Sequence, residues 1–248
     1  MGVRCLFVLV LAAWVVPIAP AMAQERDAIA QYSTLGALAA GFYDGTMTVG
    51  EMAPYGDLGL GTYDALDGEM IVIDGTYWRA AHDGTVEVVG PDTETPFVAV
   101  TFFDADLVLP VASGLDMAAL GALLDSHVAN ANLPVAVRIE GRFERLTYRA
   151  PARQNEPYPT LIEALKNQAV WTVEDIDATL VGFWYPAWLA NINVAGWHLH
   201  FVSADGTRGG HILDLMTGAA EVALDPSAEV SVLLPLTEGF ATLDLAKP

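Results

Sequence analysis

The chain has 248 residues, 53% of them hydrophobic, and a formal net charge of −20 at pH 7 from 11 Lys and Arg against 31 Asp and Glu. Such an acidic chain repels phosphate groups, which argues against nucleic acid or an anionic membrane as a partner. A small anionic substrate would need a local arginine or a metal ion. The length and apolar content are sufficient for one large core or two modest ones.

Residues 1–23 have the pattern of a secretory signal peptide. Arg4 lies in a short basic start, an apolar run covers residues 5–16, and Ala21-Met22-Ala23 has the small residues of a cleavage site. The apolar run is shorter than the ~20 residues that span a bilayer, which favours cleavage over an uncleaved membrane anchor. We therefore predict export to the periplasm or the extracellular space, with no membrane attachment after cleavage.

The only cysteine of the chain, Cys5, would be removed with this segment. The mature protein would then have no disulfide and no thiolate ligand for a metal. Any metal ion must therefore bind to histidines and carboxylates.

Short strands and a few helices are predicted in chain order. Apolar residues at helical spacing predict a helix over residues 27–43, which ends at Asp44-Gly45. Gly-rich loops and short apolar strands follow, with hairpin turns at Asp74-Gly75 and Asp83-Gly84. The strands are expected at residues 69–73, 76–81, 85–89, 96–103 and 107–111.

The second half of the chain continues this pattern. A helix is predicted over residues 115–128 and another over 160–167, and the stretch 151–159, which is punctuated by prolines, marks a domain boundary. The chain is therefore predicted to be an α+β protein with mixed or antiparallel sheets. We expect a signal peptide over 1–23, an N-terminal α/β domain over 24–150 and a β-rich C-terminal domain over 151–248. Further strands are expected at residues 135–148, 170–173, 178–185, 221–224 and 229–234.

Three histidines lie on the two arms of one predicted hairpin, in the segment GWHLHFVSADGTRGGHILDL. If Asp205-Gly206 is the two-residue turn, the pairing places His200 directly opposite His211. His198 lies two residues before His200 on the same strand, so it shares that face of the sheet. A bulge at Gly209-Gly210 would shift this register by one residue.

Three neutral imidazoles on one face are the ligand set of a catalytic zinc ion with a fourth position open. The zinc site is therefore predicted on a β-hairpin of the second domain. A single histidine on a strand is more often an ordinary core or surface residue, but three on one hairpin face favour Zn²⁺. From the residues alone, the site could belong to a secreted zinc hydrolase, to another zinc enzyme or to a periplasmic metal-binding module.

The sequence resembles the bacterial α-acetolactate decarboxylase family. The resemblance rests on STLGALAAGFYDGTMTVGEMAPYGDLGLGTYDALDGEMIVIDG, on LTYRAPARQ and on GWHLHFVSADGTRGGHILD, three segments in the family order that together cover nearly all of the mature chain. The resemblance implies a two-domain α/β fold, a homodimer and a zinc enzyme. Its expected substrate is a small anionic 2-hydroxy-3-oxo acid, 2-hydroxy-2-methyl-3-oxobutanoate (2-acetolactate), which would lose carbon dioxide to give acetoin.

The resemblance also assigns roles to residues of this chain. By motif, the zinc ligands fall on His198, His200 and His211, which the hairpin argument selects independently. The family's active-site glutamate, arginine and threonine fall on Glu69 in LDGE, Arg149 in LTYRA and Thr62 in GLGT. The resemblance also implies an acid that a C-terminal tail brings towards the metal; Glu238 is the nearest candidate here and is not included in the predicted site.

These residue types suit the chemistry that the resemblance implies. Loss of carbon dioxide leaves an electron pair next to a ketone, and zinc chelated by the ketone and hydroxyl oxygens would stabilise the resulting enediolate. The fork of Arg149 matches a carboxylate, and a protonated Glu69 could deliver a proton to carbon. Such an acid must have a raised pKa, through burial or a neighbouring group, to work at neutral pH.

Overall fold

The computed structural model describes residues 1–2 and 27–246 of the chain. Apart from its first two positions, the predicted signal peptide lies outside the described residues. Within the described ranges, every helix is too short or too polar to cross a bilayer.

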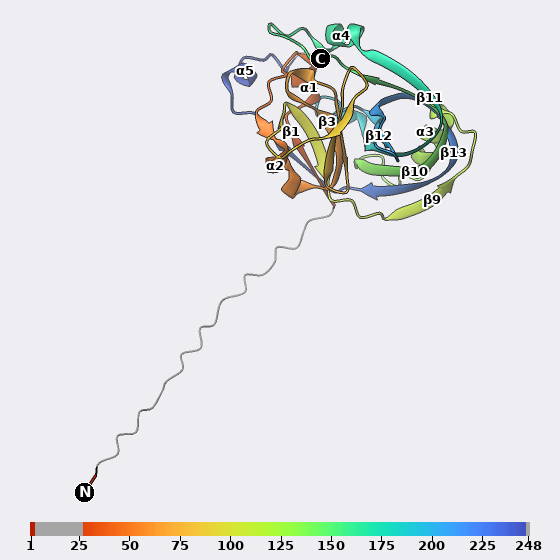
Figure 1. Ribbon diagram of the computed structural model, residues 1–248, viewed down its shortest axis with the longest axis horizontal. Coiled ribbons are helices and arrows are strands. Elements are labelled where there is room, and N and C mark those ends of the chain that lie inside the picture. Colours follow the sequence, from red (N-terminus) through yellow and green to blue (C-terminus); the bar gives the residue numbers. More distant parts are fainter. Residues whose placement is uncertain (3–26, 247–248) are drawn as a thin grey trace.

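Strands dominate the structure and helices are few and short, as the sequence predicts (Figure 1). The first sheet has seven strands in the order β14-β1-β8-β3-β4-β5-β6. It is mixed, because β14 runs parallel to β1 whereas the other neighbours are antiparallel. Its strands are β1 (Ala28–Tyr32), β3 (Leu58–Thr62), β4 (Glu69–Ile73), β5 (Thr76–Ala80), β6 (Val86–Val88), β8 (Phe97–Thr101) and β14 (Glu229–Leu233).

The second sheet has five strands in the order β10-β11-β12-β13-β9 and closes on itself, because β10 also pairs with β13. Figure 1 shows its long strands curving around α3. Leu120 and Leu124 of α3 are buried in the core of this sheet. Its strands are β9 (Leu107–Val111), β10 (Val135–Ala150), β11 (Ala169–Tyr185), β12 (Gly196–Ser203) and β13 (Gly209–Pro226).

Short elements complete the fold around the two sheets. β2 and β7 form a separate two-stranded sheet. Their bounds are Met47–Thr48 and Glu94–Thr95, and the helices are α1 (Leu35–Ala39), α2 (Val49–Met52), α3 (Met117–Asp125), α4 (Leu161–Ala164) and α5 (Glu238–Ala241).

The two sheets pack on each other through a shared apolar cluster. Leu60 and Ile71 of the first sheet lie in it with Val181, Phe183 and Tyr185 of β11. Val181 lies opposite His200 on β12. This packing brings the histidine hairpin against β4, whose first residue is Glu69.

The helix predicted over residues 27–43 is wrong. The segment forms strand β1 and then, after Ser33 with its positive φ of 63°, the short helix α1. Thr34 caps this helix by accepting a hydrogen bond from the backbone N–H of Ala37. β1 lies inside the sheet between β14 and β8 and is buried along most of its length, so it lacks the alternation of apolar and polar residues that marks an exposed strand.

Most of the other predicted elements are confirmed, with ends shifted by a few residues. The strands expected at 170–173 and 178–185 are one continuous strand, β11, so their separation is wrong. The strand expected at 221–224 is not separate either, because it is the last part of β13. The first strand predicted after the expected helix begins at residue 69, whereas the Gly-rich residues 58–62 already form strand β3. Its glycines allow a close approach of β8, because a Cβ atom on Gly59 would lie 2.1 Å from the carbonyl oxygen of Ala99.

The predicted domain boundary at residue 151 does not separate the two large sheets. β9 and β10 precede this position and belong to the second sheet, whereas β14 follows it and belongs to the first. The division into domains over 24–150 and 151–248 stays a prediction.

Candidate active site

The histidine hairpin has the predicted register. His200 on β12 pairs with His211 on β13. The connection is longer than a two-residue turn, because β12 ends at Ser203 and β13 begins at Gly209. The register shifts between β13 and β10 all lie beyond the hairpin, from Ile212 onwards. The bulge at Gly209-Gly210 that would displace the histidines therefore does not occur.

The three imidazoles converge on one point. Nδ1 of His211 lies 3.1 Å from Nε2 of His198 and 3.2 Å from Nε2 of His200. One ligand atom of each residue lies within 4.8 Å of the other two. Two nitrogens bound at 2.0–2.1 Å to a tetrahedral zinc ion would lie roughly 3.3 Å apart, so the spacing fits such a metal.

The surroundings keep the histidines neutral and orient one of them. Nδ1 of His200 lies 2.8 Å from the carbonyl oxygen of Met70, so Nδ1 carries the proton and Nε2 presents its lone pair to the cluster. Burial lowers the pKa of His200 to about 3 and holds the pKa values of His198 and His211 well below their usual range. Neutral imidazole is the form that binds a metal ion.

Glu69 begins strand β4 and lies beside the histidines. Its Oε2 atom lies 3.5 Å from Nε2 of His200, and its Oε1 atom lies 3.9 Å from Nε of Arg149. The residue is 6% exposed. Burial raises the pKa of Glu69 to about 7, although the neighbouring Arg149 acts in the opposite direction. The carboxyl group therefore holds its proton to a higher pH than an exposed glutamate does.

Arg149 lies near the end of β10, opposite His211 in the sheet register. Its Nη1 atom donates a 2.9 Å hydrogen bond to Oε1 of Gln168, while its Nε atom is buried without a hydrogen-bond partner among the described residues. A buried donor without a partner costs free energy, which an anionic ligand could recover. The guanidinium thus has donor capacity left for a carboxylate.

Thr62 supports the turn before Glu69. The two residues form the pair of the β3–β4 hairpin that lies next to its connection. Oγ1 of Thr62 donates a 2.7 Å hydrogen bond to the carbonyl oxygen of Gly68, inside the connection between the strands. Its hydroxyl group is therefore engaged in holding the turn that presents the glutamate.

One pocket with about 500 Å³ of empty space brings all six predicted site residues together. These are Thr62, Glu69, Arg149, His198, His200 and His211. The rest of its lining is almost entirely apolar and was not predicted, because these residues come from many separate segments whose sequences carry no signal for a pocket. Apolar walls are contributed by Leu35, Leu38, Leu66, Phe97, Pro151, Leu161, Leu165 and Val194.

The turn that supplies Leu66 to this wall has an unusual backbone. Ala65 and Leu66 both have φ of 58°, in the left-handed region. For residues with a Cβ atom, this conformation costs about 1–2 kcal/mol each. Glu238, by contrast, begins α5 and is not among the residues that line the pocket.

The family of the chain follows from comparison with known proteins. The sequence model of the family described as alpha-acetolactate decarboxylase matches residues 29–247. Alpha-acetolactate decarboxylase of Methylococcus capsulatus is 37% identical over 226 residues, which cover 91% of this chain and 87% of the relative. The enzyme of the same name from Bacillus subtilis is 34% identical over 225 residues, which cover 91% of this chain and 88% of the relative.

Solved structures agree with this relationship. The crystal structure of alpha-acetolactate decarboxylase from Bacillus subtilis strain 168 matches with a TM-score of 0.87 and 33% identity, over 89% of this chain and 94% of that chain. A Staphylococcus aureus protein of unknown function, described as similar to this enzyme, matches with a TM-score of 0.85 and 29% identity, over 87% and 93% of the two chains. The chain therefore belongs to the alpha-acetolactate decarboxylase family, and it is an enzyme of the carboxy-lyase class.

Proposed function

We propose that the protein is a zinc enzyme that converts 2-acetolactate to acetoin and carbon dioxide. The observation that carries the proposal is one pocket that is lined by three neutral histidines, a glutamic acid and an arginine. Zinc ligands, a proton donor and a carboxylate-binding group are the components that this reaction needs.

His198, His200 and His211 would hold the zinc ion through one nitrogen each, leaving a fourth position open. When bound, the ion would supply Lewis-acid stabilisation of the negative charge that develops on the oxygens of the substrate. The hydrogen bond between His200 and Met70 fixes the orientation of one ligand before the metal arrives.

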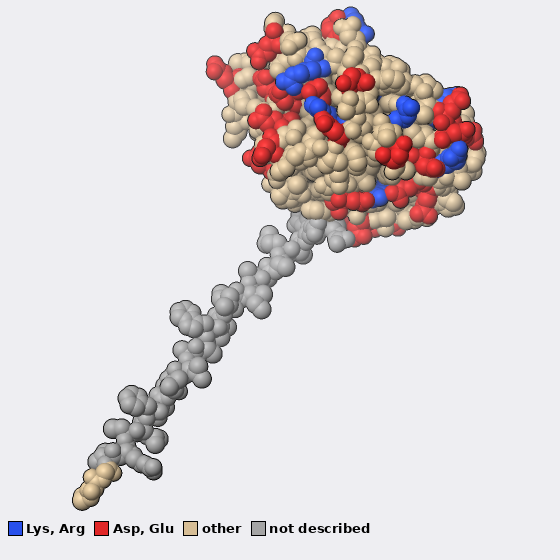
Figure 2. All heavy atoms as spheres, in the orientation of Figure 1, with Lys and Arg blue, Asp and Glu red and all other residues tan. Residues whose placement is uncertain are grey.

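Arg149 would bind the carboxylate of the substrate. Gln168 already holds one end of the guanidinium, so its remaining N–H groups have a fixed direction. The molecule needs such a local positive group, because acidic residues outnumber basic ones on the face shown in Figure 2 as in the whole chain. A bidentate contact would also orient the carbon–carbon bond that breaks.

Glu69 would deliver the proton that completes the reaction. The bond between C2 and the carboxylate carbon breaks, carbon dioxide leaves, and the electron pair remains on the substrate as an enediolate next to the former ketone. Transfer of the Glu69 proton to carbon then gives acetoin, and solvent reprotonates the carboxylate. A pKa of about 7 keeps this acid largely protonated below neutral pH.

The apolar wall of the pocket would favour this chemistry over side reactions. Leu66, Phe97 and Val194 contribute to it. Exclusion of bulk water strengthens the interactions of Arg149 and Glu69 with the substrate and limits protonation from solvent.

The proposal is tested with the purified mature protein and racemic acetolactate labelled with ¹³C in the carboxyl group. Equal amounts of acetoin and labelled carbon dioxide should appear, far faster than in a sample without protein. A zinc hydrolase would cleave esters or amides without releasing acetoin, and a metal-binding module would leave acetolactate to decay spontaneously. Either result would reject the proposed reaction.

Two further properties are proposed from the sequence. The signal-like segment over residues 1–23 supports export, and the family resemblance supports a homodimer. Sequencing of the N-terminus of secreted protein would locate a cleavage after Ala23, and light scattering would give the mass in solution. An intact N-terminus or a monomeric mass would reject the respective proposal.

A further inference from the structure

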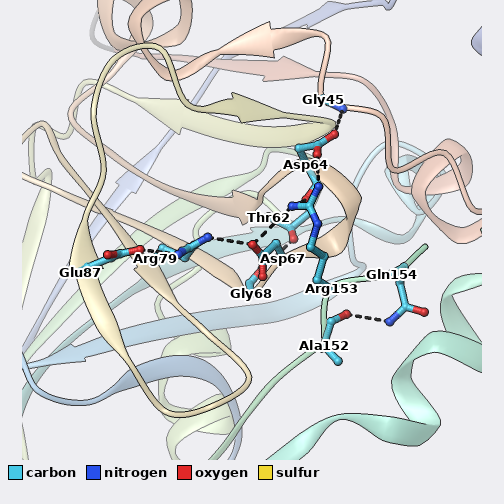
Figure 3. A network of polar contacts seen from close by, with 10 residues as sticks. All are labelled: Gly45, Thr62, Asp64, Asp67, Gly68, Arg79, Glu87, Ala152, Arg153 and Gln154. Carbon is cyan, nitrogen blue, oxygen red and sulfur yellow. Dashed lines mark hydrogen bonds and ion pairs between the residues drawn. The ribbon is translucent and has the colours of Figure 1, made fainter. Parts of the chain in front are cut away.

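A network of charged residues lies on the chain segments that carry the two charged side chains of the pocket, Glu69 and Arg149 (Figure 3). Asp67 lies two residues before Glu69, and Arg153 lies four residues after Arg149. Nη1 of Arg153 lies 3.5 Å from Oδ2 of Asp67. An outer ion pair thus joins the same two segments as the inner pair of Glu69 and Arg149.

The outer network is more extensively bonded than the inner pair. Nη2 of Arg153 lies 2.8 Å from Oδ2 of Asp64, whose Oδ1 accepts a 2.9 Å hydrogen bond from the backbone N–H of Gly45. The backbone N–H of Gln154 donates a 2.7 Å hydrogen bond to the carbonyl of Ala65. In the inner pair, Nε of Arg149 lies 3.9 Å from Oε1 of Glu69, which is too long for a hydrogen bond. Direct contact between these two residues therefore does not fix their spacing.

Asp67 has a second arginine on its other side. Nη1 of Arg79 lies 2.8 Å from Oδ2 of Asp67, and Arg79 also pairs with Glu87. Arg79 lies on β5 opposite Met70 of β4, so its position is fixed by pairing with the strand that begins at Glu69. The Asp67 carboxylate therefore lies between one arginine of the Glu69 hairpin and one arginine of the Arg149 segment, as Figure 3 shows.

The turn between these groups needs such support. Ala65 and Leu66 hold left-handed conformations without being glycines, and residues in such conformations persist only where surrounding contacts fix them. The side chain of Leu66 is 3% exposed and lines the pocket. A shift of this turn would move both the apolar wall and the start of β4.

We propose that Asp67 and Arg153 are positioning residues, which hold the left-handed turn against the segment after β10 and thereby set the spacing between Glu69 and Arg149. They act from outside, because neither is among the residues that line the pocket. The inference rests on the proposed function, since it assumes that both inner residues act on the substrate. Isolated surface ion pairs contribute little to stability, so the effect should fall on turnover and only slightly on thermal stability.

The test compares Arg153→Met, Asp67→Asn and a matched control, Arg145→Met. Arg145 also lies on this part of the chain and pairs with Asp214 at 2.8 Å, the same distance as Arg153 to Asp64, but its partner is on β13 and not in the turn. We expect kcat to fall by about 10- to 100-fold in the first two variants, because small misplacements of reacting groups are costly. Zinc content and melting temperature should stay close to wild type, and Arg145→Met should keep wild-type kcat.

A second measurement separates this inference from the proposed function. Hydrogen–deuterium exchange of residues 63–69 should be faster in Arg153→Met and Asp67→Asn than in wild type, and unchanged in Arg145→Met. If wild type released no acetoin, the proposed function would fail. The exchange measurement alone would then test whether Asp67 and Arg153 hold the turn. Arg153→Lys, which can reach one carboxylate at a time, should recover part of kcat and of the protection.

Three results would overturn the inference. The first is wild-type turnover together with unchanged exchange in Arg153→Met. The second is a loss of turnover in Arg145→Met as large as that in Arg153→Met. The third is a loss of turnover in Arg153→Met or Asp67→Asn that follows zinc content or melting temperature. The last would make the network a general structural support.

Discussion

Oε2 of Glu69 lies 3.5 Å from Nε2 of His200, so a buried carboxyl group adjoins the predicted zinc ligands although the two residues are far apart in the sequence. The hairpin β3–β4 brings the acid to this position, and the hairpin β12–β13 brings the histidine. The contact between the two sheets therefore assembles the site.

His200→Ala should remove zinc and activity together. His200 is the most buried of the three ligands, and the two remaining ligands would bind zinc weakly. Zinc per chain is measured by elemental analysis beside the initial rate. His127→Ala is the control, because His127 is exposed and its ring forms hydrogen bonds with Ser126 and Leu123 at its own helix end. A fully metallated, fully active His200→Ala protein would contradict the site.

Glu69→Gln should lower kcat by roughly 10²–10⁴-fold and leave zinc content unchanged, because the amide has no proton to deliver to carbon. The change nearly preserves shape, which limits any structural effect. Glu229→Gln, on the exposed part of β14, should behave as wild type. Loss of zinc in proportion to activity would show that Glu69 is a ligand or a structural residue instead.

Arg149→Lys should lower kcat/KM by about 10- to 100-fold, because lysine keeps the charge but loses the planar fork. Lysine also cannot keep both the contact with Gln168 and a bidentate contact with the substrate. Initial rates over a range of acetolactate concentrations give the value, with Arg145→Lys as control. Wild-type kcat/KM in Arg149→Lys would rule out bidentate binding of the carboxylate.

Gly182→Ala should weaken zinc binding by roughly 10-fold or more, an effect typical of groups that position metal ligands. Gly182 lies on β11, and a Cβ atom there would lie 1.9 Å from the carbonyl oxygen of His198, so β12 would have to move. Competition with a chelator measures the affinity. Gly121→Ala is the control, because the nearest atom to its Cβ would be 3.9 Å away. Equal affinities in the two variants would contradict this account.

Asp225 should make the protein less stable as the pH rises from about 4 to about 7. Burial, with a smaller contribution from Asp106, Asp27 and Asp104, raises the pKa of Asp225 from 3.8 to about 7, while the backbone N–H of Asp104 lowers it. The folded state then binds more protons than the unfolded state within this window, so the free energy of unfolding falls with pH. Above the window, Asp225→Asn should be more stable than wild type by about 1–2 kcal/mol.

Urea denaturation at pH 4.5 and pH 8 measures this difference. The stability gain should be present at pH 8 and nearly absent at pH 4.5, where the wild-type carboxyl group is protonated in the folded protein. Asp92→Asn, at an exposed position, should show no such pH dependence. A gain of equal size at both pH values would mean that charge at Asp225 is not the cause.

The metal ligands could be predicted because their arrangement depends on a short local segment. The pairing of His200 with His211 follows from the length of the connection around Asp205-Gly206, and the observed longer turn keeps the same register. Glu69 and Arg149 could not be placed in this way, because only the packing of the two sheets brings them together. Their assignment depended on resemblance to a family.

The errors in the fold have local causes. In β1, burial on both faces removes the alternation that marks a strand, and helical spacing of Ile29, Tyr32 and Leu35 then predicts a helix. In β3, Gly59 and Gly61 resemble loop residues, although close contact with β8 requires them. The apolar wall has no sequence signal, because each of its residues resembles an ordinary core residue.

The central claim is that zinc on the histidine hairpin and turnover of acetolactate belong to the same site. The most direct measurement removes metal with a chelator, returns zinc in steps and follows acetoin release and bound zinc on the same samples. The account predicts that activity disappears with the metal and returns linearly until about one zinc per chain is bound, as expected for a single three-nitrogen site. Full acetoin release by metal-free protein, or full zinc binding without any recovery of activity, would contradict it.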